Sequence, residues 1–204
     1  MKIYDSVKFG PERLKVFQQL LDFAKAKIIE HGFVTAEQVN RAKWTVRALD
    51  KRSYGGRKGC SFNLGGSFTD PNSRPKQGDN PWRSGTQDYF SYAHKHSKAE
   101  QGFFGFREYA RFWTRTGVGS FYSKDLNEVF LILIAHELAH FVNYTVPKNS
   151  RWSGENHKDC FLRTYFAIRQ MLLGEYKALM KLREALLAPK NPAPMKATLV
   201  AAAL

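Results

Sequence analysis

Residues 136–140 read His-Glu-Leu-Ala-His and directly follow the uninterrupted apolar run Val129–Ala135. Residues four apart lie on one face of an α-helix, so the two imidazoles of this H-E-x-x-H pattern can reach a single metal ion. Glu137 can then approach a water molecule held at that ion. A structural zinc site with four protein ligands needs no such carboxylate, so the pattern favours a zinc hydrolase.

The sequence around the motif predicts one buried helix, Leu126–Tyr144. Ser123 is a suitable N-cap, and Asp125 and Glu128 place negative charge near the first turn. The helix is apolar almost all round before His136, which implies burial. Buried histidines and a buried glutamate are costly without partners, and a metal ion is such a partner. The alternative is a core helix whose histidines form hydrogen bonds with their neighbours.

A zinc peptidase needs a third protein ligand, and His157 is the best candidate. The metzincin spacing asks for glycine at position 143 and histidine at position 146, where this chain has Asn143 and Val146. His157 instead opens a second helical segment, and it shares one predicted stripe with four apolar or aromatic residues: Phe161, Tyr165, Ile168 and Leu172. Glu155 and Glu175 remain glutamate alternatives of the gluzincin type.

Three stretches of the chain, spread over roughly residues 40 to 172, resemble the SprT-like (Spartan-like) zinc metallopeptidases, especially their small phage-encoded versions. The first is the glycine turn and strand at 53–64, and the second is Gly119–Phe121 leading into 136–144. The third is His157 followed by Phe161. The family usually has glycine after this histidine, where this chain has Lys158, and the two cysteines of the chain exclude a C-terminal zinc ribbon. The resemblance implies a zincin fold, one zinc ion per chain, and peptidase activity on DNA-associated proteins.

Length and composition predict a single domain. With 204 residues and 43% hydrophobic content, the chain can build one core, which we expect over 1–187, with a disordered tail at 188–204. The N-terminus lacks a signal-peptide pattern, and the longest apolar run is too short to cross a bilayer. We therefore expect a cytoplasmic protein, in the host cytoplasm if the chain is phage-encoded, with no membrane partner.

Periodicity and capping signals predict the remaining elements. Pro11–His31 has helical periodicity, and Thr35 with Gln38 forms a capping box for a second helix that runs to about Asp50. Gly55 and Gly56 then turn the chain into a strand. The expected fold class is α+β: a minimal zincin-like domain with a small, mostly antiparallel sheet packed against the H-E-x-x-H helix and flanking helices. The expected strands are Lys58–Phe68, Phe103–Phe106 and Val118–Tyr122, with a long loop at 69–88.

Charge is the second functional signal. The net charge is +14, and seven basic residues against the single acid Asp50 lie between positions 41 and 58. With Trp44 and Tyr54 interleaved, this patch could hold a phosphate backbone and stack on unpaired bases, so DNA is a candidate partner. The alternative is a solvated basic face. The candidate contacts are Arg41, Lys43, Arg47, Lys51, Arg52, Arg57 and Lys58.

These assignments predict a mechanism. His136, His140 and His157 would hold Zn²⁺, and Glu137 would act as general base toward water and then as proton donor to the leaving amine. The peptide or protein substrate would lie along the strand near Val118–Tyr122, and Tyr144 or Tyr165 would stabilise the oxyanion. The competing hypothesis is a nucleic-acid-binding accessory protein with a structural zinc site and no peptidase activity.

Overall fold

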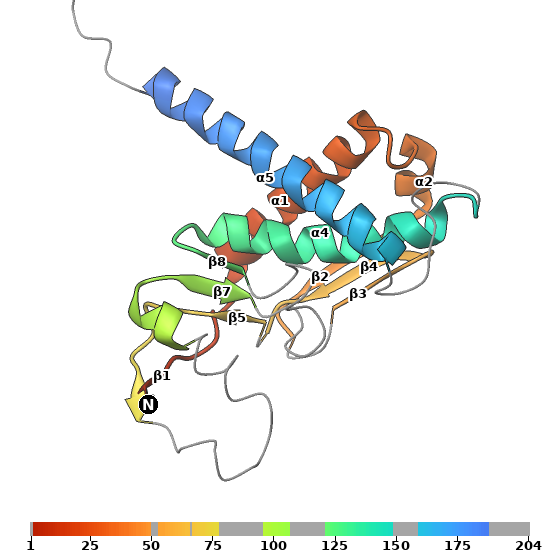
Figure 1. The fold of residues 1–204 in the computed structure, drawn as a ribbon. Helices are drawn as coiled ribbons and strands as arrows, with labels where there is room; N and C mark the ends of the chain where they lie inside the picture. The colour runs from red at the N-terminus through yellow and green to blue at the C-terminus, as the bar shows by residue number, and fades with distance from the viewer. Residues whose placement is uncertain are drawn as a thin grey trace, which may run out of the picture.

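A computed structural model describes residues 2–49, 53–65, 67–77, 96–106, 121–148 and 159–187 (Figure 1). It has a mixed α+β fold, in agreement with the predicted class. The helices are α1 (Pro11–Glu30), α2 (Ala36–Arg41), α4 (Leu126–Thr145) and α5 (Asp159–Leu187), and residues 96–100 are also helical. The strands are β1 (Lys2–Ile3), β2 (Lys43–Arg47), β3 (Tyr54–Gly56), β4 (Gly59–Asn63), β5 (Phe68–Thr69), β6 (Lys76–Gln77), β7 (Phe104–Phe106) and β8 (Phe121–Ser123).

The strands form small sheets rather than one. The described strands pair as β1-β6, β2-β4-β3 and β5-β7-β8. In the sheet next to the H-E-x-x-H helix, β4 pairs in parallel with β2 and antiparallel with β3. The expectation of a mostly antiparallel arrangement therefore holds for every pair except β2 with β4.

Helix α4 lies between this β2-β4-β3 sheet and helix α5 (Figure 1). Helix α1 packs on the same face of the sheet as α4, since Phe17 of α1 contacts Phe62 of β4 with ring centroids 5.4 Å apart. Helices α4 and α5 are antiparallel: Phe161 at the start of α5 stacks on His140, whereas Tyr176 further along hydrogen-bonds to Asp125 before α4. The H-E-x-x-H helix is thus covered on both sides.

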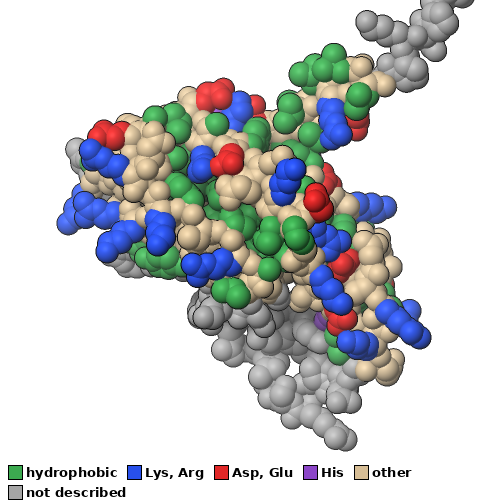
Figure 2. All heavy atoms as spheres, turned by 180° about the vertical axis from the view of Figure 1, so that it is seen from behind, with side chains coloured by type: hydrophobic (Ala, Val, Ile, Leu, Met, Phe, Trp, Pro, Cys, Tyr) green, Lys and Arg blue, Asp and Glu red, His purple; other side chains and the backbone are tan. Residues whose placement is uncertain are grey.

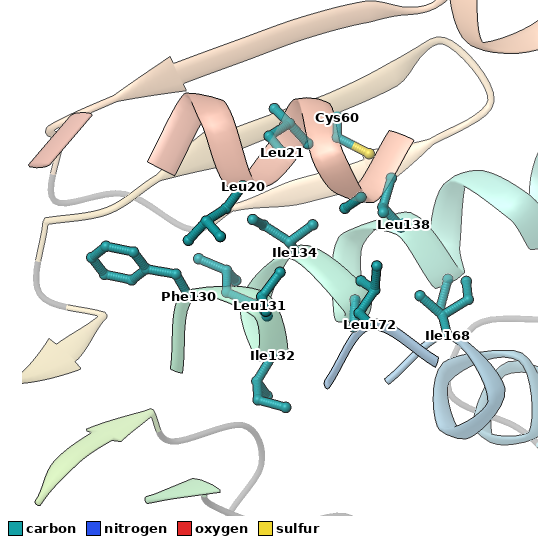
Figure 3. Close-up of a cluster of buried hydrophobic side chains, with 14 of the residues drawn as sticks. Leu20, Leu21, Cys60, Phe130, Leu131, Ile132, Ile134, Leu138, Ile168 and Leu172 are labelled. Atoms are coloured by element: carbon teal, nitrogen blue, oxygen red, sulfur yellow. The ribbon is translucent and has the colours of Figure 1, made fainter. Parts of the chain in front are cut away.

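The core is built from the faces that the periodicity predicts. The α1 residues Phe17, Leu21, Ala24 and Ile28 are fully buried, as are Tyr165, Ile168 and Leu172 of α5. Figure 3 shows Leu131, Ile134 and Leu138 of α4 between α1, Cys60 of β4 and α5. Despite this apolar character, none of the helices in the described ranges is both long and apolar enough to cross a membrane.

The predicted second helix is too long by about nine residues. The capping box of Thr35 and Gln38 is present, but the helix ends at Arg41 and Ala42 is already extended, with ψ 148°. Strand β2 follows, because Trp44, Thr45 and Val46 are aromatic or β-branched residues that fit a pleated surface better than a helix. The basic residues at positions 43 and 47 therefore project from a strand.

Several other boundaries differ from the expected ones. The strand expected over Lys58–Phe68 is two strands, β4 and β5. Of the strand expected over Val118–Tyr122, residues 121 and 122 belong to β8, and residues 118–120 lie outside the described ranges. The long loop expected at 69–88 contains the last residue of β5 and the whole of β6 in its described part. The tail 188–204 also lies outside the described residues.

Candidate metal centre

Helix α4 carries the H-E-x-x-H residues, and its start is fixed by side-chain caps. Asp125, rather than Ser123, is the N-cap, and its carboxylate accepts a hydrogen bond from the Asn127 backbone N–H at 2.8 Å. Ser123 supports this turn, since its Oγ accepts from the Asp125 N–H at 3.0 Å and donates to Glu128 at 2.6 Å. All residues from Val129 to Asn143 are buried, which follows from the apolar sequence.

The two histidines of the motif converge on one point. The Nε2 atoms of His136 and His140 are 3.2 Å apart, and the exposed fractions of the two residues are 5% and 7%. Two nitrogens that each lie 2.0–2.1 Å from a tetrahedral zinc ion are roughly 3.3 Å apart. The pair therefore fits two corners of a zinc site. Two neutral imidazoles that share one N–H···N hydrogen bond also reach this distance, depending on the tautomers.

Glu137 lies on the sheet side of α4 and is 5% exposed. The thiol of Cys60 on β4 donates a hydrogen bond to the Glu137 carbonyl oxygen at 3.4 Å. Burial raises the pKa of the Cys60 thiol, and the nearby Glu137 charge raises it further, so Cys60 stays protonated. The sulfur packs behind the helix, where it donates to the main chain of the motif.

Strand β3 packs directly on the backbone of the motif through Gly55. A Cβ at this position would stand 2.9 Å from the Cβ of His140 and would overlap the carbonyl group of Glu137. Only glycine allows such close approach. The sheet edge and the candidate site are therefore separated by no side chain at this point.

Aromatic rings of α5 cover the other side of the imidazoles. Phe161 stacks on His140 at a centroid distance of 4.4 Å and an interplanar angle of 29°, and it meets His136 edge-on at 5.2 Å. Tyr165 meets His136 edge-on at 5.7 Å. Both rings are 0–1% exposed. They restrict the orientation of the imidazoles, which is what a metal site requires of its surroundings.

A buried polar pair continues this face of α4 beyond His140. Thr164 Oγ1 donates to Asn143 Oδ1 at 2.7 Å, with the Cys160 carbonyl oxygen 3.0 Å from the same hydroxyl. Asn143 is 5% exposed and Thr164 is fully buried. The pair ties the last turns of α4 to the first turns of α5, where the chain returns from the segment that contains His157.

The candidate third ligands divide into two groups. His157 and Glu155 lie outside the described residues. Glu175 is described, and its carboxylate pairs with Lys27 Nζ and His31 Nε2, each at 3.2 Å. It is also 14 residues beyond Phe161 on α5, which is about 21 Å along a helix. Within the ranges that the structure describes, no three His, Cys, Asp or Glu side chains form a group able to hold a metal ion.

The two oxyanion candidates occupy different environments. Tyr165 is fully buried beside His136 and Phe161, whereas Tyr144 near the end of α4 is 39% exposed. Within the described part of the chain, Tyr165 is the one of the two whose ring contacts an imidazole of the motif. The expected substrate strand has its described part in β8, at one edge of the β5-β7-β8 sheet.

The predicted nucleic-acid contacts do not all lie together. Lys43, Arg47 and Lys58 line one shallow groove on the outer face of the β2-β4-β3 sheet. Arg41 pairs with Glu37 on α2, and Arg57 is exposed in the turn between β3 and β4. Lys51 and Arg52 lie outside the described residues. Trp44, expected as a stacking residue, is half-buried and packs inward on Phe141 at 5.0 Å, so it does not line this groove.

Four residues that pack around the motif helix were not predicted as part of the site: Gly55, Cys60, Asn143 and Thr164. The sequence suggested a turn at Gly55-Gly56, but both glycines belong to strand β3. Gly55 lacks a side chain where this strand contacts α4. The alternation of Cys60 and Phe62 in β4 was the available signal that both face the core.

Comparisons of the chain with models of protein families, with curated proteins and with solved structures gave no match. The functional assignment therefore depends on the residues themselves and their arrangement.

Proposed function

We propose that this protein is a zinc-dependent metallopeptidase in which Glu137 is the general base. The observation that carries the proposal is the convergence of the His136 and His140 Nε2 atoms to 3.2 Å, with Glu137 as the adjacent buried carboxylate. His136, His140 and His157 would hold the ion. When bound, zinc supplies Lewis-acid chemistry, since it acidifies water and polarises a carbonyl group.

The residues of the chain have separate roles in this proposal. Glu137 accepts the proton of the attacking water and delivers it to the leaving amine. Phe161 and Tyr165 exclude water from one side of the imidazoles and hold their orientation. Tyr165 is the better supported oxyanion stabiliser, because it is buried beside His136 whereas Tyr144 lies at the exposed end of α4.

The edge of β3 is better placed for an extended substrate than the strand near Val118–Tyr122. Gly55 of β3 lies against Glu137 and His140, and β3 pairs only with β4 among the described strands. A substrate segment that paired with this edge would lie beside the motif. DNA-associated proteins are a substrate class that the SprT-like resemblance suggests.

Metal analysis is the first test. The purified full-length chain should contain about one zinc ion, the stoichiometry of a single three-histidine site. His136→Ala and His140→Ala should each abolish binding and lower the thermal midpoint. Well-folded, unchelated protein without zinc would overturn the proposal.

Glu137→Gln tests catalysis separately from metal binding. The change keeps the side chain's size but removes its basicity, so zinc content and fold should persist while peptide hydrolysis falls at least about a hundredfold. Hydrolysis would be measured on unfolded protein substrates and as self-cleavage, with and without single-stranded or double-stranded DNA. Equal activity of E137Q and the unaltered protein would rule out the mechanism.

The second candidate function is a nucleic-acid-binding accessory protein with a structural zinc site. The groove lined by Lys43, Arg47 and Lys58 is the observation that favours it. Zinc binding without any hydrolysis that depends on Glu137, together with retained DNA binding in E137Q, would support this function over the peptidase.

A further inference from the structure

The outer face of the β2-β4-β3 sheet carries a groove on the side opposite the candidate metal centre. Side chains alternate along β2: Trp44 packs on Phe141 of α4, so Lys43, Thr45 and Arg47 project to the other face. A groove of about 250 Å³ opens there. This volume is below the roughly 300–1,000 Å³ of pockets that enclose drug-sized molecules. The groove therefore has room for one unit of a longer ligand.

The floor of the groove is made of small residues. Ser61 of β4 lies opposite Thr45 of β2 and also opposite Tyr54 of β3, so these three form one row across the sheet. In the neighbouring row, Gly59 has φ +122°, and a Cβ there would stand 2.6 Å from the Lys43 backbone nitrogen. Only glycine suits this position. Its lack of a side chain lets the Lys43 backbone pack directly against β4 at this end of the groove.

The walls of the groove are cationic. Lys43, Arg47 and Lys58 line it, and none of its described lining residues is acidic. Nearby Arg41 is neutralised by Glu37, whereas the three groove cations form no ion pair within the described part of the chain. Figure 2 shows Lys and Arg side chains gathered on the side of the molecule where Figure 1 places this sheet and α2. The groove thus presents positive charge to an anionic ligand.

Tyr54 adds an aromatic surface. Its side chain is 65% exposed, and its ring lies over Gly56, where a Cβ would come within 2.9 Å of the ring carbon that bears the hydroxyl. The ring is therefore supported on one side and accessible to solvent on the other. An exposed aromatic ring beside cations is the combination that binds unpaired bases and their phosphates.

We propose that this groove binds single-stranded nucleic acid, with phosphates at Lys43, Arg47 and Lys58 and one base stacked on Tyr54. A duplex would present its bases paired and stacked, so it could use the cations but not the ring. An acidic peptide would likewise gain nothing from Tyr54. The inference concerns a different face of the sheet from the metal centre and stands without the proposed peptidase.

The test measures how the full chain binds a fluorescently labelled oligo(dT) of about 12 nucleotides, a length within the usual site sizes. The fluorescence anisotropy of the oligonucleotide is followed over a range of salt concentrations. Lys43→Gln/Arg47→Gln/Lys58→Gln should weaken binding and reduce the slope of log K against log salt by about 2, or about 0.7 per cation. Lys8→Gln/Lys15→Gln/Lys181→Gln removes the same charge from exposed positions elsewhere and should change the slope far less.

Tyr54 is tested by two substitutions. Tyr54→Ala should weaken binding by roughly 5- to 150-fold with an unchanged salt slope, because a stacking surface is lost without a charge. Tyr54→Phe should keep the affinity. If the triple variant failed to fold, Lys43→Gln and Arg47→Gln alone should each reduce the slope by about 0.7.

Three results would overturn the inference. One is equal binding by the groove and control triple variants. Another is competition by duplex DNA as strong as that by the single strand, which would indicate contact with a paired backbone. The third is competition by polyglutamate as strong as that by the oligonucleotide, which would indicate a general anion surface. Because zinc content and hydrolysis are not measured in this assay, its failure would leave the proposed peptidase untouched.

Discussion

Gly55 of β3 and Glu137 of α4 are in direct backbone contact, with no side chain between the strand and the H-E-x-x-H helix at this point. The thiol of Cys60, on the neighbouring strand β4, contacts the Glu137 carbonyl group as well, although the two residues are 77 positions apart in the sequence. The sheet therefore fixes the position of α4 at the residue proposed as general base. Any group added at position 55 must displace one element from the other.

Gly55→Ala should destabilise the fold by about 1–3 kcal/mol, the usual cost of overpacking, and should lower zinc content by moving His140. Gly174→Ala is the matched control, because this exposed glycine within α5 has no atom within 4 Å of its would-be Cβ. Replacing a helical glycine by alanine should stabilise the protein by about 0.5–1 kcal/mol. Chemical denaturation measures both. Unchanged stability and zinc content in G55A would contradict the close contact.

His157→Ala should lower zinc affinity by more than about a hundredfold, which exceeds the usual effect of residues that only orient ligands. Glu175→Ala should leave the affinity unchanged, because Glu175 lies on the far part of α5 and pairs there with Lys27 and His31 at the end of α1. Glu155→Ala should also retain zinc. Competition with a chelator measures each affinity. Loss of zinc in E175A comparable with that in H136A would show that the third ligand is wrongly assigned.

The buried pair Asn143 and Thr164 should be energetically coupled. Thr164→Val keeps the shape but removes the hydroxyl that donates to Asn143 Oδ1, so it should cost about 1–3 kcal/mol. The double variant Asn143→Leu/Thr164→Val should lose less stability than the sum of the two single variants, because it no longer contains the Asn143 Oδ1 atom that Thr164→Val leaves without its donor. Equilibrium unfolding of the four proteins in the cycle gives the coupling. Strict additivity would mean that the hydrogen bond contributes nothing.

The local pattern of the sequence accounts for the helices and for the histidine pair. The spacing of Phe161, Tyr165, Ile168 and Leu172 predicts the buried stripe of α5, and the four-residue spacing of His136 and His140 predicts their convergence. These relationships depend on one turn of helix. They can be derived without knowledge of the rest of the fold.

Relationships across the fold could not be derived in this way. The capping box of Thr35 indicates where α2 begins, but its end at Arg41 depends on pairing of β2 with β4, which lies 16 positions further along the chain. The inward orientation of Trp44 follows from the same pairing, and it removes that ring from the predicted basic patch. Local propensity is overridden here by tertiary packing.

Tyr176 should make stability depend on alkaline pH. Its hydroxyl donates to Asp125 at 2.8 Å and accepts from Asn127 at 3.1 Å, and burial raises its pKa from 10.0 to about 12. A raised pKa means that the folded state favours the protonated hydroxyl, so the contribution of Tyr176 to the free energy of unfolding is complete below pH 10 and is lost as pH rises toward 12.

Tyr176→Phe should lower the free energy of unfolding by about 1 kcal/mol at neutral pH, and the difference in stability between this variant and the unaltered protein should shrink between pH 10 and 12. Tyr144→Phe, at a 39% exposed side chain, is the control and should change stability by less than about 0.5 kcal/mol. Urea unfolding at several pH values measures the three proteins, and a Tyr176→Phe difference that stayed constant up to pH 12 would contradict the raised pKa.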